Sequence, residues 1–139
     1  QTYEDSVLYR FFTPAPAGVL PTYRPTWVPE GYWESRSYQD ERQQIVLYQR
    51  GEDESDSFIF DYMFYSDSTE FGLLWKGDEY ELRELQVNRF TAHFYQSVDG
   101  SQTNNLLWFD ERNHILFELN APLEFDVMVH IAESVDLVK

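Results

Sequence analysis

The chain contains no cysteine and little glycine, and each shortage removes a class of function. Without cysteine, disulfides, zinc–thiolate sites and thiol catalysis are excluded. The 6 glycines form no nucleotide-phosphate loop, dinucleotide fingerprint or serine-hydrolase elbow. No apolar run approaches the roughly 18 residues that span a bilayer. No signal peptide is visible either, and we therefore expect any membrane anchor to lie upstream of Gln1, outside this sequence.

Basic residues are also scarce. Lysine occurs at Lys76 and Lys139 alone, and 25 acidic against 10 basic residues give a net charge of −15. Nucleic acids and anionic lipids are bound by clustered Lys and Arg, so neither is an expected partner. An acidic surface instead suits solubility, cation binding or a basic partner.

What the chain does have is enough apolar residues for one folded domain. Its 139 residues are 42% hydrophobic and 18% aromatic. Five of the six prolines fall between Pro14 and Pro29, which excludes a helix interior or central strand there. We expect residues 1–29 to be a lead-in, with a short helix over 4–12 and then an extended segment, and residues 30–139 to form a single α+β domain.

Strand patterns dominate from Tyr32 to Asn120. The clearest alternation sets Phe58, Phe60, Tyr62 and Phe64 on one face and a mixed set on the other. Turn-forming residues separate the runs, among them Asn88-Arg89 and Asp99-Gly100. The expected strands are 32–38, 43–50, 57–65, 79–87, 90–96, 104–109 and 114–119.

The last element reads as a helix. Pro122 suits a first helical turn, and apolar residues from Val127 to Val135 recur at helical spacing. The fold class predicted is therefore α+β, an antiparallel β-meander of about six to seven strands with a C-terminal amphipathic helix packed on one face.

Aromatic residues around the proline-rich entry are the candidate ligand-binding residues. Trp75 and Trp108 lie in apolar strands and are interpreted as core. Aromatic rings can stack on sugars or peptides, although such residues also fasten an extended segment to a domain. The candidates are Tyr23, Trp27, Tyr32 and Trp33.

Two further chemistries are weaker. The acidic run 51–57 offers carboxylates that Ca²⁺ favours, but it lacks EF-hand spacing, and we interpret it as a solvated hairpin loop. Its metal candidates are Glu52, Asp53, Glu54 and Asp56. His93, His114 and His130 share no metal-ligand spacing, so no cofactor is expected. A hydrolase using carboxylates or His93 stays as an alternative, but we expect no enzyme.

Several motifs in order carry a family resemblance. They are Trp27-Val28-Pro29-Glu30-Gly31-Tyr32, Val87-Asn88-Arg89-Phe90-Thr91-Ala92-His93-Phe94-Tyr95, Leu107-Trp108-Phe109-Asp110 and His130-Ile131-Ala132-Glu133-Ser134-Val135. Over about residues 24–137 the chain resembles domain of unknown function family 4367. Arg89 stands where the family has a turn glycine, Phe117 where Tyr is common, and Ala121-Pro122 where a helix-start Ser is expected.

The resemblance implies a location and no catalytic residues. Its members are typically extracytoplasmic, C-terminal parts of membrane-anchored proteins of Gram-positive bacteria, largely Firmicutes, and some look like anti-sigma factors or cell-surface sensors. The resemblance thus implies a non-enzymatic binding or sensing domain at the cell surface. Its partner would be a protein, peptide or lipid tail. The alternative is a secreted glycan- or peptide-binding module that uses the four aromatic residues above.

Overall fold

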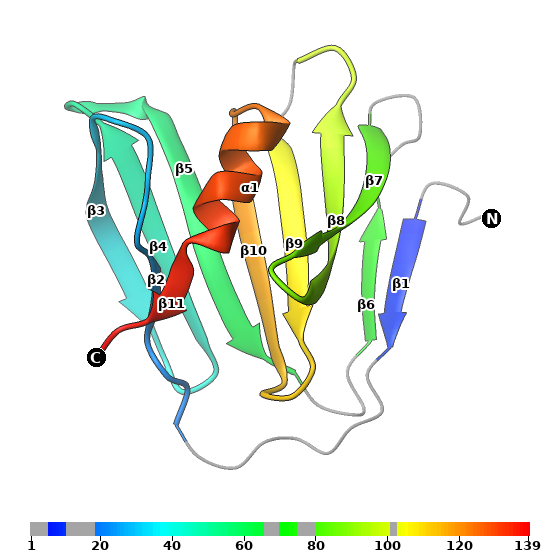
Figure 1. The fold of residues 1–139 in the computed structure, drawn as a ribbon. Helices are drawn as coiled ribbons and strands as arrows, with labels where there is room; N and C mark the ends of the chain where they lie inside the picture. The colour runs from blue at the N-terminus through cyan, green and yellow to red at the C-terminus, as the bar shows by residue number, and fades with distance from the viewer. Residues whose placement is uncertain (1–5, 11–18, 66–69, 75–79, 101–102) are drawn as a thin grey trace.

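The computed structural model describes residues 6–10, 19–65, 70–74, 80–100 and 103–139, and for 6–10, 53 and 70–74 it describes the backbone alone. Figure 1 shows one broad antiparallel sheet with a helix lying across it. The described strands are β1 (Ser6–Arg10), β2 (Tyr23–Pro25), β3 (Tyr32–Gln39), β4 (Gln43–Arg50), β5 (Asp53–Phe64), β6 (Glu70–Leu74), β7 (Tyr80–Val87), β8 (Phe90–Ser97), β9 (Asn104–Asp110), β10 (Ile115–Ala121) and β11 (Val135–Leu137). The helix is α1 (Phe125–Glu133).

The main sheet has seven strands in the order β3-β4-β5-β10-β9-β8-β7. The antiparallel sheet and the C-terminal helix expected from the sequence are confirmed, and the described residues contain more strands than expected. The prediction of a single meander is wrong. Two meanders, β3–β5 and β7–β10, instead meet where β5 pairs with β10 from Ile115↔Phe64 to Asn120↔Ile59.

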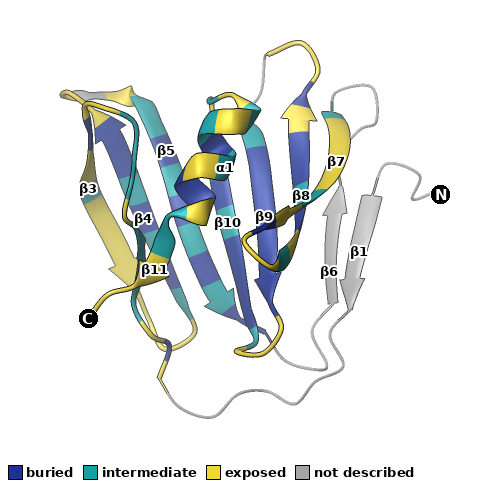
Figure 2. Cartoon of the chain, in the orientation of Figure 1, coloured by how far each residue is buried: buried dark blue, intermediate teal, exposed yellow. Residues whose placement is uncertain are grey.

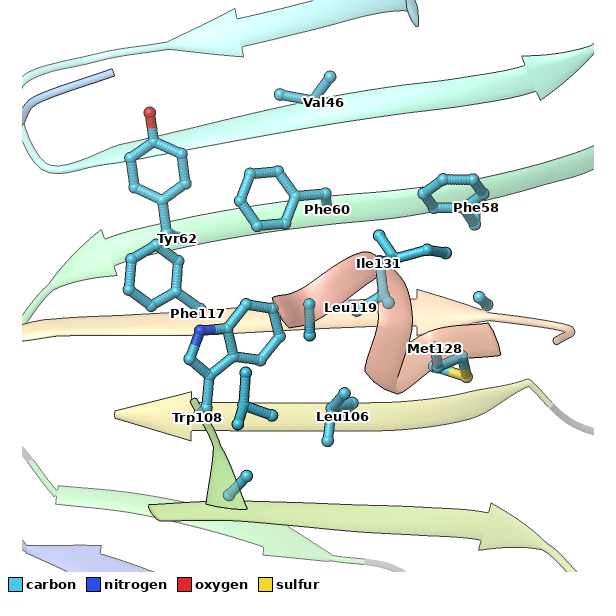
Figure 3. Packing of buried hydrophobic residues seen from close by; sticks show 14 of the residues in the cluster. Val46, Phe58, Phe60, Tyr62, Leu106, Trp108, Phe117, Leu119, Met128 and Ile131 are labelled. Atoms are coloured by element: carbon cyan, nitrogen blue, oxygen red, sulfur yellow. The ribbon is translucent and has the colours of Figure 1, made fainter. Parts of the chain in front are cut away.

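We call the face of the sheet beneath α1 the inner face and the opposite side the outer face. Alternation along β5 places Phe58, Phe60, Tyr62 and Phe64 on the inner face, all buried. This confirms the predicted apolar face. Met128 and Ile131 of α1 pack against it and are fully buried, as Figure 3 shows.

Figure 2 shows that burial is deepest along the middle strands, β9 and β10. Trp108 is buried there and stacks on Phe117, with ring centroids 5.3 Å apart. Trp108 is thus core, as predicted, whereas Trp75 lies outside the described residues.

Helix α1 is shorter than its sequence pattern indicates. It covers nine residues, starting after Glu124, whose backbone is extended (φ −71°, ψ 157°). Pro122 therefore precedes the helix instead of occupying its first turn. At the other end Ser134 caps the helix, and Val135 belongs to β11. Because β11 pairs with another strand, Val135, the last apolar residue of the predicted helical pattern, is not part of α1.

Strand β11 pairs with β2, so the proline-rich lead-in joins the C-terminal segment. The register runs from Val135↔Pro25 to Leu137↔Tyr23. Backbone hydrogen bonds continue the pair at both ends, from the N–H of Thr26 to the carbonyl of Ser134 and from the N–H of Val138 to the carbonyl of Thr22, both 2.9 Å. Pro25 is tolerated because both strands of this two-stranded ribbon are edge strands.

The helix expected over residues 4–12 is wrong for the part described. Ser6–Arg10 is a strand that pairs antiparallel with Glu70–Leu74. The residue spacing fits a short helix, but backbone pairing with a distant strand is a tertiary contact that local spacing does not report.

Local turn chemistry is confirmed in the hairpin between β7 and β8. Asn88 adopts φ 55°, the left-handed conformation that asparagine tolerates.

No helix in the described part of the chain is both long and apolar enough to cross a membrane.

Candidate binding face

On the outer face, the side chains are buried over one half of the sheet and more exposed over the other half. Toward β8–β10 it carries a second apolar cluster of buried side chains, formed by Tyr65, Tyr95, Leu107, Phe109 and Leu116. Toward β3–β5 the side chains are more exposed. We call this open part the outer strip. It consists of Trp33, Arg36, Tyr38, Ile45, Leu47 and Ile59.

Cross-strand register builds the outer strip. Tyr38 of β3 lies opposite Ile45 of β4, and Arg36 lies opposite Leu47, which in turn faces Ile59 of β5. Successive side chains alternate between faces, so these residues gather on one side of the sheet. Between them lies a shallow hollow of about 370 Å³.

Two aromatic side chains of the outer strip are about half exposed. Trp33 is 49% and Tyr38 is 55% exposed. The indole N–H of Trp33 donates to the carbonyl of Gly51 at 3.0 Å, and the Tyr38 hydroxyl donates to Asp40 at 3.1 Å. These bonds fix the ring edges and leave ring surface facing solvent. Such amphipathic rings are typical anchors for a partner.

Acidic side chains flank the outer strip at both ends. Asp40 and Glu41 lie in the turn between β3 and β4, and Glu52 and Glu54 lie where β4 leads into β5. All four residues are exposed. The guanidinium of Arg36 lies 3.3 Å from the Glu54 carboxylate, so its charge is balanced. Arg42 shares the first of these turns, and Arg50 pairs with Asp56 near the second, so each end keeps a smaller net negative charge.

The structure separates the four aromatic candidates named from the sequence. Tyr23 is half-buried and packs edge-on against Tyr62 and Phe117, at ring-centroid distances of 5.3 and 5.0 Å. Trp27 stacks on His130 of α1, with centroids 3.8 Å apart. Both lie on the helix side of the sheet.

Tyr32 and Trp33 are adjacent on β3 and therefore point to opposite faces. Tyr32 is buried against Phe58 and donates its hydroxyl to Asp56 at 2.7 Å. Burial and this hydrogen bond raise the pKa of Tyr32 to about 12. Trp33 alone among the four candidates belongs to the outer strip.

The three acidic metal candidates whose side chains are described form no metal-binding group. Asp56 accepts from Tyr32 and from Arg50, and these hydrogen bonds lower the pKa of its carboxyl. Glu54 pairs with Arg36, Glu52 is exposed, and the side chain of Asp53 lies outside the described residues. Among the described side chains, no group of three or more His, Asp or Glu could hold a metal ion.

His93, the residue of the hydrolase alternative, lies on the outer face of β8 opposite Glu84 of β7. Burial lowers the pKa of its imidazole. His130 lies on α1 and stacks on Trp27, and His114 is the last residue of the turn between β9 and β10, with φ 58°. The three histidines are therefore on separate elements.

Sequence reasoning missed a pair of carboxyl groups at the centre of the outer face. Asp61 of β5 lies directly opposite Glu118 of β10 in the register of the two strands. Burial and the neighbouring carboxylate raise the pKa of Asp61, and burial also raises that of Glu118. The sequence places Asp61 on the mixed face of residues 57–65, but the residue opposite it depends on how β5 pairs with β10.

Comparison with known proteins identifies the family. No curated protein and no solved structure matches the chain. The sequence model of one family matches residues 22–135, a range that starts beside β2 and ends at the first residue of β11. This range covers well over half of the chain and takes in the whole seven-stranded sheet with its helix. The chain therefore belongs to the family described as Domain of unknown function (DUF4367).

Proposed function

We propose that this chain is a non-enzymatic binding or sensing domain of a membrane-anchored bacterial protein, located outside the cytoplasmic membrane. Its ligand is an extended peptide segment with apolar side chains and basic flanks. The resemblance of its motifs to extracytoplasmic family members supports the location. The open outer strip is the single observation that carries the binding role.

The form of the ligand follows from the edge of the sheet. Strand β3 pairs with β4 on one side, and no described strand lies along its other side. An extended peptide can add to such an edge through main-chain hydrogen bonds, while side chains of alternate peptide residues fill adjacent pockets. The hollow beside Tyr38, Ile45 and Leu47 lies next to that edge.

The charge of the ligand follows from the charge of the domain. Acidic residues flank both ends of the outer strip, and the whole chain carries a net charge of −15. Basic residues flanking the apolar peptide positions would be attracted to these ends, and would speed association at low salt.

A random heptapeptide display library tests this proposal. We expect enrichment of peptides in which apolar residues alternate with other residues and Lys or Arg lies near the ends. Synthetic copies of the enriched peptides should change the fluorescence of Trp33 on binding. Tyr38→Ser should weaken their binding by about tenfold, the range for loss of an aromatic anchor.

Leu82→Ser is the matched control. Leu82 is 48% exposed, on the opposite edge strand β7, so its replacement should leave the affinity unchanged. No enriched peptide, or equal weakening by both variants, would overturn the assignment to the outer strip. Binding of soluble wall oligosaccharides that is lost in Trp33→Ser, with no peptide binding, would favour the glycan-binding alternative.

A further inference from the structure

The Asp61–Glu118 pair lies at the junction between the two halves of the sheet. Strands β5 and β10 are the last strands of the two meanders, and their pairing joins these meanders in the main sheet. Asp61 and Glu118 face each other in the middle of this pairing, on the outer face. Two ionised carboxylates directly opposite across antiparallel strands repel each other.

The immediate neighbours of the pair are not cationic. In the same cross-strand row, Ile45 of β4 lies beside Asp61, and Leu107 of β9 lies beside Glu118. Along the two strands, the next side chains on the outer face are apolar or amide groups. They are Ile59, Met63, Leu116 and Asn120.

The other charged and titratable groups on the described part of the outer face lie farther from the pair. Tyr65 follows the end of β5, and Tyr95 of β8 lies opposite Asn105 of β9. His93 of β8 lies beyond Leu107, and Glu84 of β7 lies beyond His93. On the other side Tyr38 of β3 lies beyond Ile45, and Arg36 of β3 is already paired with Glu54. Each of these groups on β3, β7 and β8 is two or three strands away, or about 10 Å and more at the usual strand spacing.

A shared proton is the simplest way to satisfy this geometry. Two close, poorly solvated carboxyl groups titrate as a unit, and the first proton is held more tightly than by an isolated carboxyl. A hydrogen bond between two carboxyl groups requires such a proton.

We propose that Asp61 and Glu118 together bind one proton at neutral pH, and that loss of this proton as the pH rises weakens the junction between β5 and β10. The pair is thus a proton-binding site at the junction of the two meanders. This inference does not depend on the proposed peptide ligand.

The sign of the effect follows from linkage. A carboxyl whose folded-state pKa is raised lets the folded chain hold more protons than the unfolded chain. The contribution of the pair to the free energy of unfolding is then largest below the ordinary carboxyl pKa of about 4 and falls as the pH rises through the raised value. His93 acts in the opposite direction, because burial lowers its pKa and stability rises as it deprotonates.

Urea unfolding of the full chain between about pH 5 and pH 9 tests the proposal. In the wild type, the equilibrium constant for unfolding should rise by about tenfold or more over this range. A pKa that is raised by about one unit in the folded state corresponds to a tenfold change in this constant. Glu118→Gln removes the neighbouring charge but leaves Asp61 buried, so this rise should become smaller, and the double variant Asp61→Asn/Glu118→Gln should lose it. Glu81→Gln removes an exposed carboxyl from β7, and this matched control should keep the wild-type pH dependence.

Infrared spectroscopy gives a direct reading on the wild-type protein, whatever the stability of the variants. At about pH 7, a carbonyl band of a protonated carboxyl should be present, and it should be absent from the double variant Asp61→Asn/Glu118→Gln. Absence of the band from the wild type overturns the proposal. So does an unchanged pH dependence of unfolding in a folded Glu118→Gln.

Discussion

At the scale of single residues, the hydroxyl of Tyr62 connects the lead-in to the sheet. It accepts the backbone N–H of Tyr23 at 2.8 Å, donates to the side-chain carbonyl of Gln44, and lies 3.1 Å from the carbonyl of Pro21. Tyr62 is 1% exposed, so water cannot replace the hydroxyl. We expect Tyr62→Phe to lower the free energy of unfolding by about 1–3 kcal/mol, measured by urea denaturation.

Tyr38→Phe is the control for that prediction. Its hydroxyl also donates to a side chain, but at the surface, so the loss should be within about 0.5 kcal/mol. If the two variants lose equal stability, the buried hydrogen bonds of Tyr62 are not what holds the lead-in in place.

Residue positions within one strand were predictable, whereas pairs across strands were not. Alternation along residues 57–65 correctly predicted the buried inner face, and the same rule separates Tyr32 from Trp33. The Asp61–Glu118 pair was beyond the sequence, because it requires the register of two strands that are more than fifty residues apart.

At the scale of elements, α1 begins without a side-chain cap. Glu124 occupies the N-cap position, and its side chain makes no capping hydrogen bond. A serine hydroxyl there can accept from the free N–H groups of the first turn. We expect Glu124→Ser to raise the free energy of unfolding by about 0.5–1 kcal/mol, measured by thermal and urea denaturation.

Asp126→Ser distinguishes capping from loss of charge. Asp126 lies inside the first turn, where its negative charge favours the helix N-terminus, so its removal should destabilise slightly. Stabilisation by both variants would show that relief of net negative charge, and not a new cap, is responsible.

Hairpins were predictable as elements because both strands and the turn lie close together in the sequence. The strands on either side of Asn88 fall within one residue of their predicted bounds. The pairings β1–β6, β2–β11 and β5–β10 join distant segments, and local patterns carry no information about them. This is why a helix was predicted at 4–12, and why one meander was predicted instead of two.

At the scale of the whole molecule, a net charge of −15 should make stability depend on salt. Raising NaCl from about 0.05 M to about 0.5 M shortens the screening length from roughly 14 Å to roughly 4 Å, which weakens repulsion among the carboxylates. We expect the melting temperature to rise by about 2–6 °C, measured by calorimetry.

Calcium chloride at matched ionic strength separates screening from binding. Screening alone predicts a similar shift for both salts, because the described carboxylates form no metal cluster. A further rise on addition of micromolar Ca²⁺ at constant ionic strength, lost in Glu52→Gln/Glu54→Gln, would instead favour the metal-site alternative in the acidic run.

The ribbon of β2 and β11 has a mechanical consequence. Tyr23, the first residue of β2, pairs with Leu137, the last residue of β11, so the chain enters and leaves this ribbon at the same end. Tension between the segment before Thr22 and the segment after Leu137 would therefore pull the two strands apart like a zipper, loading one hydrogen bond at a time. The first bond loaded would be the one from Val138 to Thr22. A tether attached at these two points would open the ribbon beside α1 long before it could shear the main sheet.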